Sequence, residues 1–304
     1  MKPPPFEYHA PDTREQALAL MARYGGEARV LAGGQSLVPA MNFRLVAPSV
    51  LVDLNGVADL FGIEQSEDGR LHIRAMTRQR MVERSSLVAG AAPLIAEAMP
   101  HIAHPQIRNR GTFGGSLAHA DPAAELPAVV LALDGLLKVQ RQAEGEGDDT
   151  IAERIVPASD FFLGMFTTAL QPDEILVEAI LPPLPPRTGT AFEEFARRLG
   201  DYALAGACAV VTLDAGYPSG GVVRDARLVL FAVGDMPVRS TSAEGVLRGQ
   251  VPSVEAISAA AEAATDDIDP HTDIHATAAY RRHLVRVLAK RALVRAVQRA
   301  QERM

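Results

Sequence analysis

The segment GTFGGSLAHADPAAELPA, residues 111–128, places a glycine pair, two hydroxyl side chains, a histidine and two carboxylates before a long apolar run. Glycine allows backbone conformations with positive φ and lets another group approach the main chain closely. Consecutive amides in such a turn can point toward one anion. The segment LAGGQSLVPAM, residues 31–41, repeats this composition, with an apolar strand leading into Gly33 and Gly34 and then Ser36. The two segments predict a pair of amide-rich turns that bind an anion.

The pairing of the two segments carries more weight than either one. A single Gly-Gly is more often a tight turn than a ligand site. Two pairs, each flanked by hydroxyls and by a strand end or a helix start, favour two turns that close on the halves of a diphosphate, and therefore a dinucleotide ligand. The chain has no G-x-G-x-x-G opening a βαβ unit and no G-x-x-x-x-G-K-[ST]. A Rossmann fold and a P-loop fold are therefore disfavoured.

Composition limits the class of protein. The chain has 304 residues, 48% hydrophobic and 22% charged, which is typical of a globular protein with two or three lobes. A net charge of −7 and a pI near 5.6 argue against nucleic acid as the partner. The single cysteine, Cys208, can supply neither an intrachain disulfide nor an iron–sulfur cluster. Any such cluster must belong to another chain.

Two segments bear on localisation and partners. The start, MKPPPFEYHAP, lacks the apolar core of a signal peptide, and no run approaches the ~20 apolar residues that span a bilayer. We therefore predict no transmembrane segment and a cytoplasmic protein. The basic residues between Arg281 and Arg303 spread around a helical wheel, which indicates a solvated or interface helix rather than a nucleic-acid arm.

Local patterns predict alternating helices and strands in the first 181 residues. A helix over residues 12–26 has Asp12 or Thr13 as N-cap and Gly25 as its stop. After the second glycine pair, Asp121 is expected to cap a helix whose first turn holds Pro122. Strands are expected at 28–34, 49–55, 71–76 and 173–181, and helices at 77–85 and about 93–99. The segments 136–140 and 153–162 are expected to bracket a polar, hairpin-like loop at 142–150.

The proline run LPPLPPR, residues 181–187, must be extended and marks the expected domain boundary. We predict one domain over residues 1–181, with subdomains of about 1–55 and 56–181, and a second over 187–304. The second domain is expected to hold three strands followed by two helices. These strands lie at 191–199, 205–214 and 223–233, and the helices near 252–264 and 276–302.

Catalytic and metal-binding patterns are weak. His101, His104, His119 and Asp121 include metal-ligand types, but their spacing is loose and no glutamate follows in zincin style, so we predict no metal. The chain has no G-x-S-x-G nucleophile elbow and no persuasive acid/base pair. The sequence predicts no catalytic residue.

Four segments carry a resemblance to a known family. They are AGGQSLVPAMNFRL (32–45), PQIRNRGTFGGSLAHADPAAELPAVVLAL (105–133), PASDFFLGMFTTALQPDEILVEAI (157–180) and DIHATAAYRRHLVRVLAKRAL (273–293). Together they resemble the FAD-binding medium subunit of the molybdenum hydroxylase family, which includes xanthine dehydrogenase and aerobic carbon monoxide dehydrogenase. The likeness runs from about residue 5 to 300. It implies an α+β fold, with a two-subdomain FAD-binding domain of the vanillyl-alcohol oxidase type and a carboxy-terminal domain of a three-stranded antiparallel sheet with helices.

The resemblance also implies a set of cofactor contacts. The first glycine segment would wrap the FAD diphosphate with Ala32, Gly33, Gly34, Gln35, Ser36 and Leu37. The second would face it with Thr112, Phe113, Gly114, Gly115 and Ser116. Phe113 stands where the family often has isoleucine, which changes the bulk beside the diphosphate but leaves the amides available.

Six further positions match family contacts, each with a plainer alternative. Glu125 stands where relatives carry an aspartate near the ribose, and the alternative is a helix-face carboxylate. Ile102 and Leu176 match apolar neighbours of the cofactor, Leu176 beside the isoalloxazine, although core packing would explain both. Tyr202 could cover one ring face or pack on a strand. His119 is expected to contact the cofactor. Asp121 is expected either to contact the cofactor or to serve only as a helix cap.

The resemblance implies an electron-transfer role. The medium subunit would hold noncovalent FAD and pass electrons to an oxygen, quinone or NAD acceptor. A small subunit with [2Fe–2S] clusters and a large subunit with molybdopterin would be its partners, in a dimer of heterotrimers. Two rivals stay open: a stand-alone flavin oxidase or reductase, and a nucleotide-binding regulatory protein. Arg44, Arg108 and Arg110 are close enough in sequence to assist cofactor binding, although surface roles are expected for at least two of them.

Overall fold

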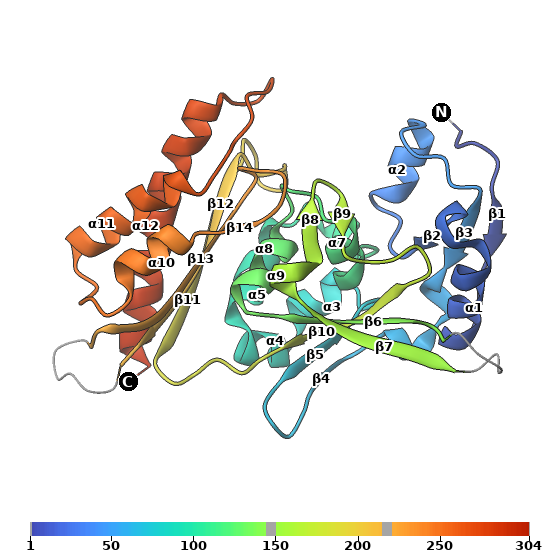
Figure 1. Ribbon diagram of the computed structural model, residues 1–304, viewed down its shortest axis with the longest axis horizontal. Coiled ribbons are helices and arrows are strands. Elements are labelled where there is room, and N and C mark those ends of the chain that lie inside the picture. The colour runs from blue at the N-terminus through green and yellow to red at the C-terminus, as the bar shows by residue number, and fades with distance from the viewer. Residues whose placement is uncertain (1, 144–149, 215–220, 304) are drawn as a thin grey trace.

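Three parts of the chain lie side by side in the computed structural model, which describes residues 2–143, 150–214 and 221–303 (Figure 1). The amino-terminal part lies at one end, a helix-covered sheet in the middle, and the carboxy-terminal part at the other end. Most of the predicted polar loop at 142–150 lies outside the described residues. No helix in the described ranges combines the length and apolar character needed to cross a membrane.

The amino-terminal part is a small parallel sheet with two helices. Its elements are β1 (Glu7–His9), α1 (Arg14–Tyr24), β2 (Ala28–Leu31), α2 (Leu37–Asn42) and β3 (Val50–Asp53), with strand order β1-β3-β2. The hydroxyl of Thr13 accepts from the amide of Gln16 at 3.3 Å, and Gly25 ends α1 with φ 49°. The predicted helix is confirmed, with Thr13 rather than Asp12 as its cap.

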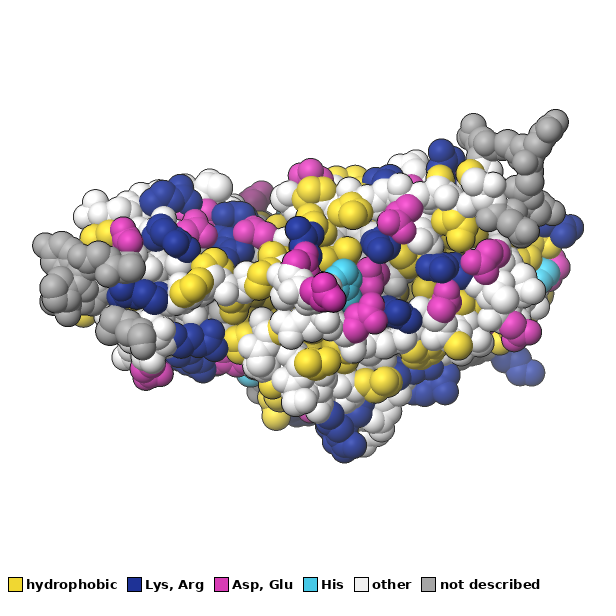
Figure 2. Space-filling model, turned by 90° about the horizontal axis from the view of Figure 1, so that it is seen from below, with side chains coloured by type: hydrophobic (Ala, Val, Ile, Leu, Met, Phe, Trp, Pro, Cys, Tyr) yellow, Lys and Arg dark blue, Asp and Glu magenta, His cyan; other side chains and the backbone are white. Residues whose placement is uncertain are grey.

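The middle part is a five-stranded antiparallel sheet under a layer of short helices (Figure 1). Its strands, in the order β4-β5-β10-β6-β7, are β4 (Ile63–Gln65), β5 (Leu71–Arg74), β10 (Ile175–Leu181), β6 (Leu136–Gln142) and β7 (Ile151–Pro157). Every residue of β10 is buried, as the apolar run predicts. Figure 2 shows charged side chains of both signs scattered among hydrophobic and other atoms on the lower face. On this sheet, Lys138 forms an ion pair with Glu178 at 3.2 Å, and Nδ1 of His72 lies 3.3 Å from the same carboxylate.

Seven short helices in the described residues of the middle part come before, contain or follow the second glycine pair. They are α3 (Gln79–Arg84), α4 (Ser86–Ala91), α5 (Pro93–Ala98), α6 (Pro105–Arg108), α7 (Phe113–His119), α8 (Glu125–Ala132) and α9 (Ala158–Phe161), with a hairpin of β8 (Phe162–Gly164) and β9 (Thr167–Thr168). The prediction that a helix begins at Pro122 is wrong. Ala120, at φ 49°, ends α7, and Asp121 Oδ1 accepts from the amide of Ala123 at 2.9 Å, so this carboxylate stabilises the turn before α8.

The carboxy-terminal part is an antiparallel sheet with helices on one face. Its elements are β11 (Thr188–Phe195), β12 (Ala205–Leu213), β13 (Val223–Phe231), β14 (Val238–Arg239), α10 (Thr241–Leu247), α11 (Val254–Ala263) and α12 (Ala278–Glu302). The three predicted strands are confirmed, and the two-residue β14 extends their sheet. Cys208 lies on β12 with no exposed surface.

We call the contact of α5 and α8 with β11, β12 and β13 the domain seam. One hydrophobic core runs across it, from Leu126 of α8 to Phe192 and Phe231 of the sheet. Glu97 of α5 accepts from Arg295 and, at 2.6 Å, from Arg299. These arginines belong to the basic helix α12, which is therefore an interface helix within the chain.

Candidate functional site

The structure brings the two glycine segments into contact. A Cβ atom built on Gly33 would lie 2.5 Å from the carbonyl oxygen of Arg110 and 2.7 Å from Cα of Gly111. A Cβ atom built on Gly115 would lie 3.5 Å from Cβ of Ala32. Segments some eighty residues apart in the sequence thus form one surface between α2 and α7.

Close packing explains why these positions are glycine. A Cβ on Gly114 would lie 2.4 Å from Cβ of Ala75, and one on Gly115 would lie 2.5 Å from the Thr112 hydroxyl. We expected the glycines to leave space for a cofactor, but protein atoms occupy the space beside Gly33, Gly114 and Gly115. Gly34 differs because its φ of 73° lies in the left-handed region that favours glycine.

The backbone amides of the first glycine segment lack hydrogen-bond acceptors in the described part of the chain, whereas those of the second have them. None of the amides of residues 33–37 donates to an acceptor in the part of the chain that the structure describes. In the second segment, the amide of Phe113 donates to Thr77 O, that of Gly114 to Ala75 O, and that of Gly115 to Thr112 Oγ1. The first segment is therefore a row of unused donors at the start of α2, and an anion is the complementary ligand.

A polar network fixes this row of donors. Asn55 Nδ2 donates to the carbonyl of Ala32 at 3.0 Å. Arg78 donates to Asn55 Oδ1 and to the carbonyl of Arg110, each at 2.6 Å. Burial, and then the charge of Arg110, lowers the pKa of Arg78. Sequence reasoning missed Asn55 and Arg78, because their partners lie 23 and 32 residues away.

The hydroxyl of Ser116 is held beside the same surface. Gln79 Nε2 donates to Ser116 Oγ at 2.8 Å, which leaves the hydroxyl hydrogen free to donate in turn. Gln79 is 3% exposed, and its Oε1 has no hydrogen-bond partner among the described residues. The sequence singled out Ser116 but gave no signal for Gln79.

His119, Asp121 and Tyr202 lie at the far end of α7. The rings of His119 and Phe166 are 5.0 Å apart, and burial lowers the pKa of the histidine. Tyr202 is 65% exposed. The hydroxyl end of this exposed side chain is partly withdrawn from water, which, followed by the charge of Asp121, raises the pKa of Tyr202 to about 12. The tyrosine is therefore not packed into a strand, which was the alternative for it.

Ile102 and Leu176 belong to the hydrophobic core of the middle part. Both are buried, at 7% and 5% exposure, as the core-packing alternative requires. The carbonyl of Ile102 accepts from Arg108, which also donates twice to Glu83 at 3.1 Å. Arg108 is therefore engaged in structural bonds, and Arg44 and Arg110 are exposed.

Two buried carboxyl groups lie at the domain seam. Glu125, the first residue of α8, is 7% exposed, and burial raises its pKa to about 7. The side chain of Glu194 on β11 is 3% exposed, and burial and then the charge of Glu125 raise its pKa to about 8. Among the described residues, Glu194 Oε2 has no hydrogen-bond partner. The sequence indicated Glu125 but not Glu194, whose only signal was a charged residue in an apolar strand.

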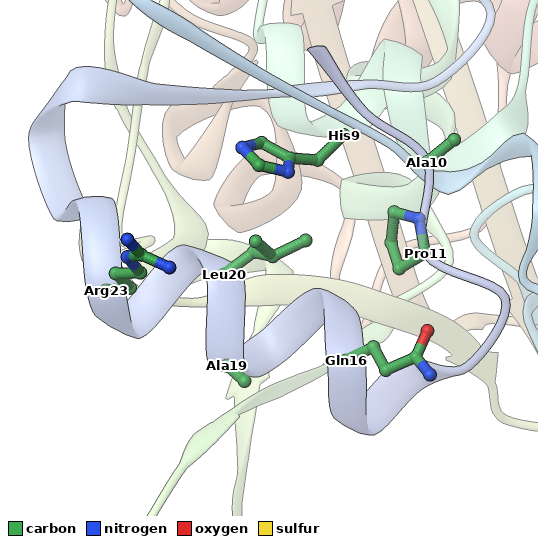
Figure 3. Close-up of a pocket in the computed structure, with 7 residues that line it drawn as sticks. All are labelled: His9, Ala10, Pro11, Gln16, Ala19, Leu20 and Arg23. Atoms are coloured by element: carbon green, nitrogen blue, oxygen red, sulfur yellow. The ribbon is translucent and has the colours of Figure 1, made fainter. Parts of the chain in front are cut away.

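Two hollows of the described surface are lined by residues outside the glycine segments. One of about 460 Å³ is lined by Arg197, Arg198 and Asp201, directly before Tyr202. The other, of about 410 Å³, lies between the segment after β1 and helix α1 (Figure 3). Its lining residues are His9, Ala10, Pro11, Gln16, Ala19, Leu20 and Arg23.

Comparison with known families identifies a flavin-binding class of protein. Residues 4–184 match the family described as "FAD binding domain in molybdopterin dehydrogenase", and residues 190–296 match "CO dehydrogenase flavoprotein C-terminal domain". The chain belongs to this family of FAD-binding subunits of molybdenum hydroxylases. The predicted α+β class, FAD as cofactor, and the role of an electron-transfer subunit of an oxidoreductase are thereby confirmed.

Similar proteins extend over the whole chain. It is 43% identical to the 6-hydroxypseudooxynicotine dehydrogenase complex subunit alpha of Paenarthrobacter nicotinovorans, over 99% of this chain and 97% of that one. It is 39% identical to the carbon monoxide dehydrogenase medium chain of Hydrogenophaga pseudoflava, over 96% and 97%. A solved structure of carbon monoxide dehydrogenase from that organism superposes with a TM-score of 0.90 at 38% identity, covering 98% of this chain and 99% of that one. The relatives give no support to a stand-alone flavin oxidase or reductase.

Proposed function

We propose that the amides of residues 33–37 bind the diphosphate of noncovalent FAD. The observation that carries this proposal is the row of amides without an acceptor in the described part of the chain, held by Asn55 and Arg78. Ser116, oriented by Gln79, adds a hydroxyl donor from the second segment. The other amides of that segment are engaged within the protein, so its main task is to support the first segment.

The remaining predicted contacts fall into two groups in this proposal. His119, Asp121, Glu125 and Tyr202 surround the end of α7 and bind polar parts of the cofactor, with Tyr202 exposed enough to cover a ring face. Ile102 and Leu176 act from the core, by shaping the wall behind the site. FAD supplies the electron-transfer chemistry, and the chain supplies binding and orientation.

Relatives form multi-subunit complexes, and this chain has partner subunits of the same kind. We propose a small partner with [2Fe–2S] clusters and a large one with molybdopterin, in a dimer of heterotrimers, because the single buried cysteine here supplies no cluster. The domain bounds 1–181 and 187–304 are supported by the two family matches, which meet between residues 184 and 190. The cytoplasm and the choice among oxygen, quinone and NAD stay predictions.

The substitution Ser36→Asp tests the diphosphate site. Its carboxylate lies at the start of α2, where negative charge stabilises a helix by about 0.3–1 kcal/mol, so folding should not suffer. Against a diphosphate, one charge near 4 Å costs roughly 1–4 kcal/mol, and FAD affinity should fall about tenfold or more. Bound flavin is measured by visible absorption of the purified chain.

The control is Ser159→Asp on α9, far from both glycine segments in the sequence. It should retain FAD at the wild-type level. Full FAD in Ser36→Asp would contradict the assignment of residues 33–37 to the diphosphate, whatever the stability of the variant.

A further inference from the structure

Two groups of large apolar side chains are exposed beside the glycine segments. The group on and after α2, which we call the α2 patch, consists of Val38, Phe43, Leu45 and Val46. The group on the β8–β9 hairpin, which we call the hairpin patch, consists of Leu163, Met165 and Phe166. Their exposures run from 40% for Val46 to 79% for Leu45. Apolar side chains that are grouped on a surface, unlike single ones, mark a site that another molecule covers.

The α2 patch adjoins the first glycine segment. Residues 33–37 lead directly into α2, and this six-residue helix spans about 9 Å, so both of its ends lie close to the row of unused amides. A Cβ atom built on Gly34 would lie 3.3 Å from Cγ2 of Val38, so the first member of the patch is in contact with that row. The other members follow at the end of the helix, within residues 43–46.

The hairpin patch adjoins the helix that carries the second glycine pair. The amide of Phe166 donates at 3.1 Å to the carbonyl of Ala120, which directly follows α7. The ring of Phe166 also lies 5.0 Å from the ring of His119, the last residue of α7. Because the two glycine segments contact each other, the two patches flank one candidate cofactor site.

Backbone hydrogen bonds hold the α2 patch in place. Arg44, at φ 60°, separates Phe43 from Leu45, and the amides of Arg44 and Leu45 each donate at 2.9 Å to a carbonyl of α2. A positive φ is uncommon at a residue other than glycine, and here it turns the chain after the helix. The turn presents its apolar side chains to solvent in one fixed arrangement, so a partner that binds them loses little conformational entropy.

The composition of both segments is that of a protein–protein interface. The segment LVPAMNFRLVAP, residues 37–48, has one charged residue, Arg44, and FFLGMFTT, residues 161–168, has none. The cores of interfaces are poor in Lys, Glu and Asp and rich in aromatic residues, Met and Arg. Helix α2 and the β8–β9 hairpin both lie on the upper side of the molecule in Figure 1, away from the lower face of Figure 2, so one partner can contact both patches.

The position of the patches indicates which partner covers them. Electron transfer through protein slows steeply with distance, so a chain that exchanges electrons with bound FAD has to dock beside the cofactor site. The single cysteine of this chain is buried and supplies no iron–sulfur cluster, so the electron donor is the small [2Fe–2S] partner proposed above. A molybdopterin subunit that delivers its electrons through these clusters has no need to cover the flavin.

We propose that the α2 patch and the hairpin patch together form the docking surface for the small [2Fe–2S] subunit. This inference rests on the proposed function, to which both the FAD site and the small partner belong. The apolar side chains of both patches become buried in the contact, and the small subunit covers the site between them.

The docking surface is tested with the FAD-loaded chain and the cluster-bearing subunit that copurifies with it. Biolayer interferometry measures their affinity. The pair Phe43→Asp and Leu45→Asp charges the α2 patch, and the pair Leu163→Asp and Met165→Asp charges the hairpin patch. All four side chains are exposed, so folding should not suffer, and each pair should weaken binding roughly thirtyfold or more. The control Val254→Asp, at an exposed position at the start of α11, should bind like the wild type.

Hydrogen–deuterium exchange provides a second measurement that needs no substitution. The amides of residues 37–48 and 161–168 should exchange more slowly in the complex than in the isolated chain, whereas those of residues 254–263 on α11 should exchange equally. Unchanged affinity in either double variant, or equal exchange of both segments with and without the small subunit, would refute the docking surface.

The other occupants give different results. Protection that appears only with the large subunit, or in a dimer of this chain alone, would assign the surface to that occupant and overturn the proposal. Flavin absorption is recorded separately from docking. A chain that binds no FAD but is protected at both patches by the small subunit would overturn the proposed function and leave the docking surface standing.

Discussion

Gly114 offers the sharpest test of why the second segment contains glycine. In Gly114→Ala the new Cβ would lie 2.4 Å from Cβ and 2.7 Å from Cα of Ala75, where carbon atoms normally approach to about 3.5–4.0 Å. The amide of Gly114 also donates to the carbonyl of Ala75 at 2.8 Å, so α7 cannot move away without weakening this bond. Overpacking of this kind costs about 1–3 kcal/mol. We expect the upper part of that range because the obstacle is backbone.

Gly90 on α4 is the matched control. No atom lies within 4 Å of its added Cβ, so Gly90→Ala should gain about 0.5–1 kcal/mol from helix propensity. Urea unfolding followed by far-UV circular dichroism measures both variants, and the two should differ by roughly 2–4 kcal/mol. A Gly114→Ala protein as stable as wild type would refute the packing argument. If that stable variant also lost FAD, space for the cofactor would be the reason for glycine.

Three further predictions concern the seam and the polar network. Glu125 and Glu194 bind protons more tightly in the folded chain, so the free energy of unfolding should fall as the pH rises from about 4.5 to 8. In Glu194→Gln this fall should be smaller by on the order of 3 kcal/mol. Urea unfolding that gives the same pH dependence in the variant and the wild type would contradict this prediction. Glu97→Gln leaves Arg295 and Arg299 without their shared carboxylate and should lower unfolding free energy by about 1–3 kcal/mol, against little change for Glu302→Gln. Arg78→Ala removes two hydrogen bonds, should cost roughly 3 kcal/mol and should release FAD; full retention would show that Asn55 alone positions the first segment.

Local signals in the sequence predicted the parts of the fold that local rules govern. The cap at Thr13, the stop at Gly25 and the fully apolar β10 follow from backbone chemistry and periodicity within one segment. The start of α8 was misplaced because Asp121 and Pro122 suit a turn as well as a helix start. Contact between Ala120 and the hairpin, through the amide of Phe166, is a tertiary feature that no local signal reports.

In the candidate site, too, local sequence signals predicted some features, and others depend on tertiary contacts. Both glycine segments stood out in the sequence, but which amides remain unused depends on acceptors such as Ala75 O and Thr77 O, more than thirty residues away. Asn55, Gln79 and Glu194 are ordinary polar residues in their own segments, and only packing gives them their positions. The sequence therefore predicted that the two glycine segments come together, but not which of them keeps free amides and which has its amides bonded within the protein.

Because Cys208 is fully buried, the reaction of its thiol with a labelling reagent would report on opening of the folded chain. The thiol has no exposed surface, and burial raises its pKa, so maleimides and disulfide reagents should leave the folded chain unlabelled. A cysteine introduced on the surface can then carry a spin label or fluorophore without removal of the natural thiol. The rate at which Cys208 itself is labelled would measure how often the domain seam opens.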